Sequence, residues 1–112
     1  LEHTKELLSD LISAREKTIS IYEIQKQVSS YYNLLQADMC SSRRSINIAR
    51  PRQIAMYLCK NLTSFSYPEI GKAFGGKDHT TVIHAVKKIE LLFNNDQRIK
   101  KQIKDLKESI LS

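Results

Sequence analysis

The sequence predicts an all-α fold: a small helical bundle that contains a helix-turn-helix and a basic loop, with one further helix ahead of it. The 112 residues include only two prolines and three glycines, and they are rich in leucine, isoleucine, lysine, glutamate and glutamine, which favour helices. Apolar residues also recur at spacings of three and four, the period of one helix face. A chain of this length fits one domain with a core of its own.

Two helices are predicted in the first third of the chain. Over residues 4–17, an apolar stripe at helical spacing predicts an amphipathic helix, and its members are Leu7, Leu8, Leu11 and Ile12. The second helix is predicted to begin at Ser20–Glu23, because a serine followed three residues later by a glutamate is the pattern of a capping box. Apolar residues continue at helical spacing from there to about residue 32.

The middle of the chain is predicted to be irregular up to about residue 50. A short turn of helix is expected near residues 34–39, and the polar run at 40–49, CSSRRSINIA, shows no helical period. The third helix is predicted to begin near Pro51, because proline suits the first helical position. Its core face consists of aliphatic and small residues: Ile54, Ala55, Leu58, Cys59 and Leu62.

A helix-turn-helix is predicted next. Ser66–Glu69 is a second capping box with a proline in its first turn, and it opens a short helix. Gly75 and Gly76 end that helix, because the closing turn requires a residue with positive φ. Asp78 is a suitable N-cap for the longer helix that follows, and Asp96 for the last helix of the chain.

The net charge of +6 is concentrated in the middle of the chain. Between Asp38 and Glu69 there is no acidic residue, and the basic ones are Arg43, Arg44, Arg50, Arg52 and Lys60. Arginine outnumbers lysine there, and its planar guanidinium suits bidentate contacts to phosphate and guanine. Such a charge indicates an acidic partner, either nucleic acid or an anionic membrane surface, although a merely soluble basic domain is an equal alternative.

The first turn of the second helix in the motif carries four polar residues: Asp78, His79, Thr80 and Thr81. In a helix-turn-helix these positions face base edges in the major groove. An aspartate can accept from cytosine, and a threonine offers a hydroxyl and a methyl group. The outer face of the helix continues as Thr81, His84 and Lys88, with Lys87 beside it, so that one face packs and the other can meet phosphates.

Simpler interpretations of the same residues stay open. Asp78 can be a plain N-cap, and His84 an ordinary surface histidine. A zinc site is disfavoured, because His79 and His84 are five residues apart, which is the wrong rotation for one helix face. The residue types of a catalytic set occur, but there is neither a nucleophile elbow nor a G-x-x-x-x-G-K-[ST] loop. We therefore expect no enzyme.

The cysteines and the apolar runs suggest the cellular setting. Cys40 and Cys59 form no C-x-x-C pair, and no apolar run approaches the length of a membrane span. We expect a reduced cytosolic protein with two small buried thiols. The chain has no signal peptide and no initiator methionine, and it is interpreted as a piece of a longer cytosolic protein.

Two adjoining runs of the sequence resemble a known family. The run GGKDHTTVIHAVKKIE, preceded by ARPRQIAMYLCKNLTSFSYPEIGKAFGG, resembles the C-terminal DNA-binding domain, domain IV, of the DnaA family of bacterial chromosomal replication initiators. The strong resemblance covers about residues 18–95. It implies a Trp-repressor-like helix-turn-helix domain over 18–112, and a connector helix over 1–17 that leads from an ATPase domain absent here. No cofactor is implied for this chain, because ATP binds in that missing domain.

The resemblance implies a partner and a place in the cell. The partner is double-stranded DNA, at DnaA boxes of the TTATNCACA type in the replication origin, and the chain would be cytoplasmic and nucleoid-associated. The isolated domain would be monomeric. A weak contact with acidic phospholipid near the connector helix is also implied, although residues 1–17 carry a net charge of −1, which is unfavourable for an anionic surface.

The resemblance further implies roles for individual residues. Base contacts are expected from Arg44, Pro68, Asp78, His79, Thr80 and Thr81. Among these, Arg44 would enter the minor groove, whose negative potential attracts arginine, and Pro68 would contact a thymine methyl. Contacts to the DNA backbone are expected from Arg43, Arg52, Gln53, Lys60, Lys77, His84, Lys87 and Lys88.

Three residues depart from the family pattern. Lys77 stands where many relatives carry arginine, Tyr67 where a smaller aliphatic residue is common, and Ser42 where a further basic residue often occurs. Two other classes of function compete with DNA-box binding. One is an unrelated, dimeric helix-turn-helix transcription regulator, and the other is a module that associates with anionic membranes through its first helix.

Overall fold

The structure is a computed structural model that describes residues 19–112. The helix predicted over 4–17, and with it the proposed boundary between residues 17 and 18, lies outside the described residues. Within 19–112 the chain is all-α, as predicted, and contains no strand. The elements are α2 (Ile21–Tyr31), η1 (Gln36–Cys40, a 3₁₀ helix), α3 (Ile46–Leu62), α4 (Tyr67–Ala73), α5 (His79–Asn95) and α6 (Gln97–Leu111).

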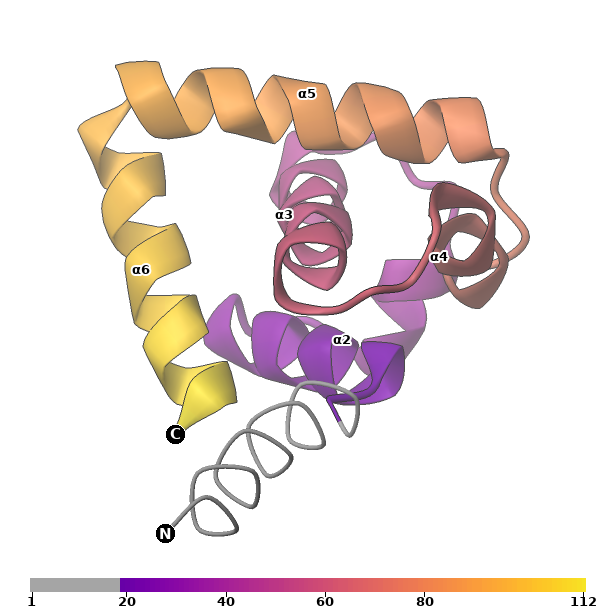
Figure 1. The fold of residues 1–112 in the computed structure, drawn as a ribbon, viewed down its shortest axis with the longest axis horizontal. Helices are drawn as coiled ribbons and strands as arrows, with labels where there is room; N and C mark the ends of the chain where they lie inside the picture. The colour runs from indigo at the N-terminus through magenta and orange to yellow at the C-terminus, as the bar shows by residue number, and fades with distance from the viewer. Residues whose placement is uncertain (1–18) are drawn as a thin grey trace, which may run out of the picture.

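The helices are arranged around α3, which lies at the centre of the bundle (Figure 1). On one side α5 crosses over it, and on the other side lies α2; both pack extensively against it. The short helix α4 packs beside the first half of α5, and α6 turns back from the end of α5 to reach α2 (Figure 1). The helix-turn-helix of α4 and α5 is therefore supported from behind by α3.

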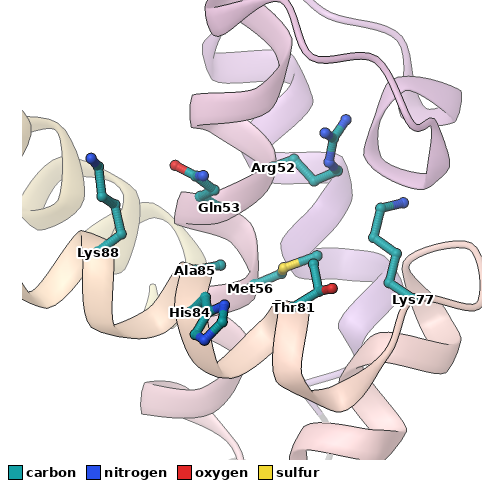
Figure 2. A pocket seen from close by; sticks show the side chains of 8 residues that line it. All are labelled: Arg52, Gln53, Met56, Lys77, Thr81, His84, Ala85 and Lys88. Carbon is teal, nitrogen blue, oxygen red and sulfur yellow. The ribbon is translucent and has the colours of Figure 1, made fainter.

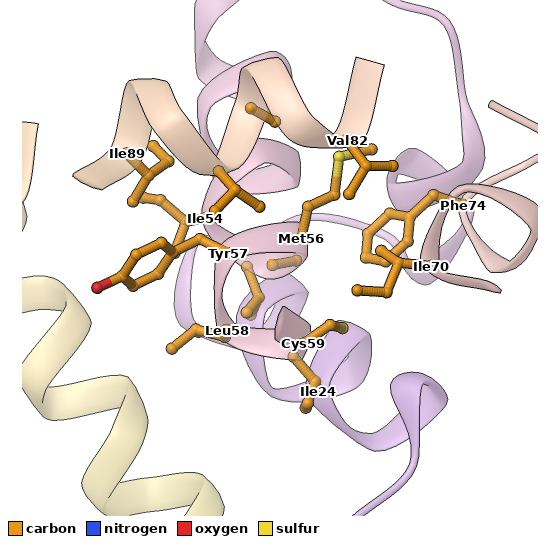
Figure 3. Packing of buried hydrophobic residues seen from close by; sticks show 14 of the residues in the cluster. Ile24, Ile54, Met56, Tyr57, Leu58, Cys59, Ile70, Phe74, Val82 and Ile89 are labelled. Carbon is orange, nitrogen blue, oxygen red and sulfur yellow. The ribbon is translucent and has the colours of Figure 1, made fainter. Parts of the chain in front are cut away.

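The core is formed by apolar side chains from all of these helices (Figure 3). From α3 come Ile54 and Leu58, and from α4 comes Phe74, its C-cap residue; all three are fully buried. Val82 of α5 is also fully buried against them. Burying a side chain of this size stabilises the fold by about 1.5–3 kcal/mol, so this shared core fixes α4 and α5 relative to α3.

The largest difference from the sequence prediction is the start of α3. The helix begins at Ile46, five residues before Pro51, and the run at 40–49 was wrongly predicted to be entirely irregular. Ser45 is its N-cap residue, and its carbonyl accepts hydrogen bonds from the amides of Ile48 and Ala49, at 2.9 and 2.7 Å. Pro51 thus lies inside the helix, where its missing N–H leaves the carbonyl of Asn47 without its usual intrahelical donor.

Burial explains why the helix extends past this proline. Ile48 and Pro51 are both buried, and they continue the core face of α3 at a spacing of three towards its N-terminus. Packing therefore outweighs the cost of the proline. As a result the basic loop, predicted over 40–49, consists of residues 41–45 only, and we use the name in this sense below.

The two cysteines differ in their surroundings. Cys59 is fully buried in α3, and burial raises the pKa of its thiol. Cys40 is exposed at the end of η1, so the expectation of two buried thiols was wrong for this residue. It is the last residue of η1, and its carbonyl lies against the turn at Gly75. Within residues 19–112, no helix is both long and apolar enough to cross a membrane.

Candidate nucleic-acid interface

The turn between α4 and α5 is as tight as the two glycines suggest. Gly75 and Gly76 have φ values of +88° and +73°, in the left-handed region. The amide of Lys77 donates to the carbonyl of Gly71 at 2.8 Å. A Cβ atom on Gly71 would lie 2.2 Å from the Lys77 carbonyl oxygen. This close approach of turn and helix fixes the direction in which α5 leaves the turn.

The N-terminus of α4 is held by the predicted capping box. The amide of Glu69 donates to the Ser66 hydroxyl at 3.3 Å, and the amide of Ser66 donates to the Glu69 carboxylate at 3.0 Å. Hydrogen bonding of the Ser66 amide, and of its hydroxyl, to the carboxylate holds the pKa of Glu69 below its usual value. Pro68 stands exposed in this first turn.

The first turn of α5 is exposed at all four predicted base-contact positions. Asp78 is the N-cap residue by its extended backbone, but its side chain makes no capping hydrogen bond. Instead its Oδ1 lies 2.9 Å from Nδ1 of His79. Hydrogen bonding with the Thr80 hydroxyl, aided by the imidazole, lowers the pKa of Asp78. The plain N-cap interpretation is therefore only half right, because the carboxylate faces other side chains of the exposed edge.

A pocket of about 370 Å³ opens between α3 and α5 (Figure 2). Arg52 and Gln53 come from α3, Lys77 from the turn, and His84 and Lys88 from α5. The carbonyl oxygen of the Gln53 side chain is buried and has no hydrogen-bond partner. The structure thus gathers six residues of the predicted interface around one hollow: Arg52, Gln53, Lys77, Thr81, His84 and Lys88.

Arg52 differs from the other cations of this group, because it is only 9% exposed. Its Nη2 donates to the Arg43 carbonyl at 2.7 Å. Its Nη1 donates to the Ser41 hydroxyl at 3.3 Å and, weakly, to the Asp38 carbonyl at 3.5 Å. Burial lowers the pKa of Arg52, while the nearby Asp38 opposes that shift. The side chain is thus bound to the basic loop and the end of η1.

Two lysines of the predicted interface also have partners within the protein. Nζ of Lys60 lies 4.5 Å from the centre of the Tyr67 ring and 3.4 Å from the Phe65 carbonyl oxygen. Nζ of Lys77 donates to the Phe74 carbonyl at 2.6 Å, and burial lowers its pKa. Tyr67 thus packs under a lysine, and Lys77 binds the end of α4 with a single amine; both stand at positions expected to depart from the family pattern.

The remaining predicted residues lie outside the pocket. Arg43 and Arg44 are exposed in the basic loop, together with Ser42, the third departure, and Lys87 is exposed on α5. Met56 and Ala85 line the pocket although no sequence signal singled them out; their positions follow only from the packing of α3 on α5. Among residues 19–112, no three His, Cys, Asp or Glu side chains lie close enough together to hold a metal ion.

The fold and this exposed edge define the class of protein. Two helices joined by a glycine turn, with the first turn of the second helix exposed and basic residues around it, form a helix-turn-helix DNA-binding domain. Domains of this class bind nucleic acid and do not catalyse a reaction.

Comparison with known proteins identifies the family. The family described as bacterial DnaA protein helix-turn-helix matches residues 21–89. The chain belongs to this family. It is 53% identical over 103 residues to the chromosomal replication initiator protein DnaA of Rickettsia canadensis (strain McKiel), and equally to that of Rickettsia massiliae (strain Mtu5). Each match covers 92% of this chain and 22% of the relative, so the chain spans about a fifth of these proteins.

A solved structure shows the same fold. The crystal structure of a DNA replication initiation factor superposes with a TM-score of 0.74 and shares 31% sequence identity. The match covers 97% of this chain and 36% of the other.

Proposed function

We propose that this chain binds double-stranded DNA at DnaA boxes of the TTATNCACA type, and that it does so for a longer initiator protein at a bacterial replication origin. One observation carries the proposal. Polar and basic side chains from α3, the turn and α5 gather around one pocket, next to a first turn of α5 whose four polar residues are all exposed. Membership of the DnaA helix-turn-helix family supports the choice of box.

In the proposed complex the first turn of α5 enters the major groove. Asp78, His79, Thr80 and Thr81 contact base edges there. The short spacing between Asp78 and His79, 2.9 Å between Oδ1 and Nδ1, orients one side chain against the other before DNA arrives. Pro68, exposed at the start of α4, contacts a thymine methyl.

The DNA backbone and the minor groove are bound by the surrounding residues. Arg44 of the basic loop enters the minor groove at the A·T-rich end of the box, where a narrow groove strengthens the negative potential. The proposed contacts to phosphates come from Arg43, Gln53, Lys60, Lys77, His84, Lys87 and Lys88. Arg52 lines the same pocket as Gln53, Lys77, His84 and Lys88. Gln53 lines the pocket next to cations that attract a phosphate, and its side-chain NH2 group is the donor that would contact it.

The proposal has consequences for location and stoichiometry. A chain that binds the origin is cytoplasmic and nucleoid-associated, and a single box is bound by one copy. A footprint that requires two copies on a palindrome would instead indicate an unrelated dimeric regulator.

A weak contact of residues 1–17 with acidic phospholipid is a minor part of the proposal, and vesicle flotation with and without these residues tests it.

The proposed function is tested by fluorescence anisotropy with a box duplex and a scrambled duplex of equal composition, at two salt concentrations. We expect at least a hundredfold preference for the box, and an affinity that falls steeply with salt, as about five to seven phosphate contacts require. Equal affinity for the two duplexes would rule out sequence-specific binding.

A further inference from the structure

We propose that Arg52 is a positioning residue: it holds the basic loop in place so that Arg44 is presented to the minor groove in register with α5. This inference rests on the proposed function, since it concerns how the same interface is assembled. It departs from the expectation that Arg52 is one more phosphate contact.

The contacts of Arg52 support this role. From the second turn of α3 its guanidinium reaches across to the basic loop, and its shortest hydrogen bond, 2.7 Å, goes to the carbonyl of Arg43, the residue directly before Arg44. The Ser41 hydroxyl and the Asp38 carbonyl accept from the other nitrogen. One planar guanidinium thus binds three acceptors within residues 38–43. Arginine suits this arrangement, and the single amine of a lysine cannot reproduce it.

Burial separates Arg52 from the cations that face solvent. It is 9% exposed, and both of its terminal nitrogens already donate within the protein. His84 and Lys88 line the same pocket and are exposed, so they can bind a phosphate without giving up a bond. Three of the five N–H groups of Arg52 already donate to the loop and the end of η1, so fewer are left for a phosphate than on an exposed cation.

The other end of the loop is held by the turn of the helix-turn-helix. A Cβ atom on Gly75 would lie 2.3 Å from the carbonyl oxygen of Cys40, so the backbone at the end of η1 rests directly against the turn. Cys40 Sγ also lies 3.5 Å from the Ala73 carbonyl oxygen. The start of the loop therefore contacts the end of α4 and the turn after it, and Arg52 binds the loop to α3. Both α3 and α4 pack against α5, so the loop is held in a fixed position relative to α5.

Ordering the loop in advance strengthens binding, because the conformational entropy of the loop is already lost before DNA is bound. The benefit of Arg52 must then depend on Arg44. The test is a double-mutant cycle of Arg52→Lys and Arg44→Ala, measured as affinity for the box duplex. We expect Arg52→Lys to weaken binding about tenfold in the wild-type background, and about twofold or less when Arg44 is already alanine.

A matched control is Lys88→Ala, which removes an exposed cation from the same pocket. We expect it to weaken binding by the same factor in both backgrounds. If Arg52→Lys also lost the same factor in both, Arg52 would be an independent DNA contact and the inference would be wrong. A failure of the proposed function looks different, because the wild type itself would then not distinguish the box from a scrambled duplex.

A second measurement needs no DNA. Amide hydrogen exchange of the free protein should be at least tenfold faster in Arg52→Lys than in wild type at Ser41 and Arg43, whose amides are hydrogen-bonded within this segment, with α5 unchanged. Lys88→Ala should leave the exchange of the loop unchanged. Unaltered loop exchange in Arg52→Lys would contradict the inference, and unchanged exchange in the helices excludes general unfolding as the cause of the lost affinity.

Discussion

At the scale of single residues, the exposed face of α5 carries polar side chains that packing of the core does not require. Thr81 is exposed on α5 and lines the pocket, while Val82 beside it is fully buried. The helix thus divides sharply into a packed face and a polar face. This division could be predicted from the alternation of residue types along α5, because helical periodicity fixes which side chains share a face.

Thr81→Ala tests the base-contact role. It removes a hydroxyl and a methyl from an exposed position, so we expect little change in stability. Binding to the box should weaken by about 1–3 kcal/mol, with the loss confined to one or two base pairs. Anisotropy with a set of singly substituted boxes measures this. An equal loss on every duplex, including a scrambled one, would show that Thr81 binds the backbone instead.

The role of Arg52 could not be predicted from its residue type. In the sequence it is one of five basic residues between Asp38 and Glu69, and charge gives no sign of which ones are buried. Only the three-dimensional path of the basic loop over α3 shows that this guanidinium is bound within the protein. The distances between Asp78, His79 and the pocket likewise depend on packing.

At the scale of elements, the two glycines of the turn have different requirements. Both have positive φ, but a Cβ atom on Gly75 would meet the Cys40 carbonyl at 2.3 Å, whereas a Cβ on Gly76 would meet nothing within 4 Å. The sequence pattern predicted the turn and treated the two residues alike. The contact with η1 comes from a segment more than thirty residues earlier in the chain, so no local pattern could reveal it.

Gly75→Ala and Gly76→Ala form a matched pair. Each substitution places a side chain on a left-handed backbone, which costs about 1 kcal/mol or more of stability, but only Gly75→Ala also displaces η1. We therefore expect the free energy of unfolding to fall clearly further for Gly75→Ala, and box affinity to fall with it. Urea unfolding followed by circular dichroism measures the difference. Equal destabilisation by the two variants would mean that the contact with Cys40 is not important.

The capping box of α4 predicts a dependence on pH. Hydrogen bonds with Ser66 hold the folded-state pKa of Glu69 below its ordinary value of 4.5. The stabilisation is therefore complete above that value, and it is lost as the pH falls through the folded-state pKa. Glu69→Gln keeps an acceptor at this position without a titrating group.

We expect Glu69→Gln to lose less stability than wild type between about pH 5 and about pH 3. Unfolding in urea at a series of pH values measures this. Glu108→Gln, at an exposed position near the end of α6 and outside any N-cap, is the control and should keep the wild-type dependence. An identical acid dependence in Glu69→Gln and wild type would show that the capping box does not contribute.

The start of α3 shows the limit of predicting helix boundaries from local sequence rules. Pro51 and the polar run before it favoured a late start by local rules. Buried Ile48 and the cap at Ser45 move the start to Ile46, because tertiary packing outweighs local preference. The other described α-helices begin within about two residues of their predicted starts, since each has a capping residue that the sequence displays.

At the scale of the whole molecule, positive charge alone does not identify the interface. The last helix, α6, also carries four lysines, but three of them have partners within the protein. Lys100 and Lys107 lie near the ring of Phe93, and Lys101 pairs with Asp105 at 3.4 Å. What distinguishes the other side is the combination of the basic loop, the pocket and the exposed first turn of α5, all supported by α3 (Figure 1).

The central claim, that α5 and the basic loop bind DNA together, is tested most directly by an NMR titration of the labelled protein with a box duplex. Amide shifts should change most at residues 41–45, at the start of α4 and in the first turn of α5, and they should saturate at one protein per duplex. Amides of α6 should change little. Largest changes along α6, or no preference of these changes for the box over a scrambled duplex, would contradict the account.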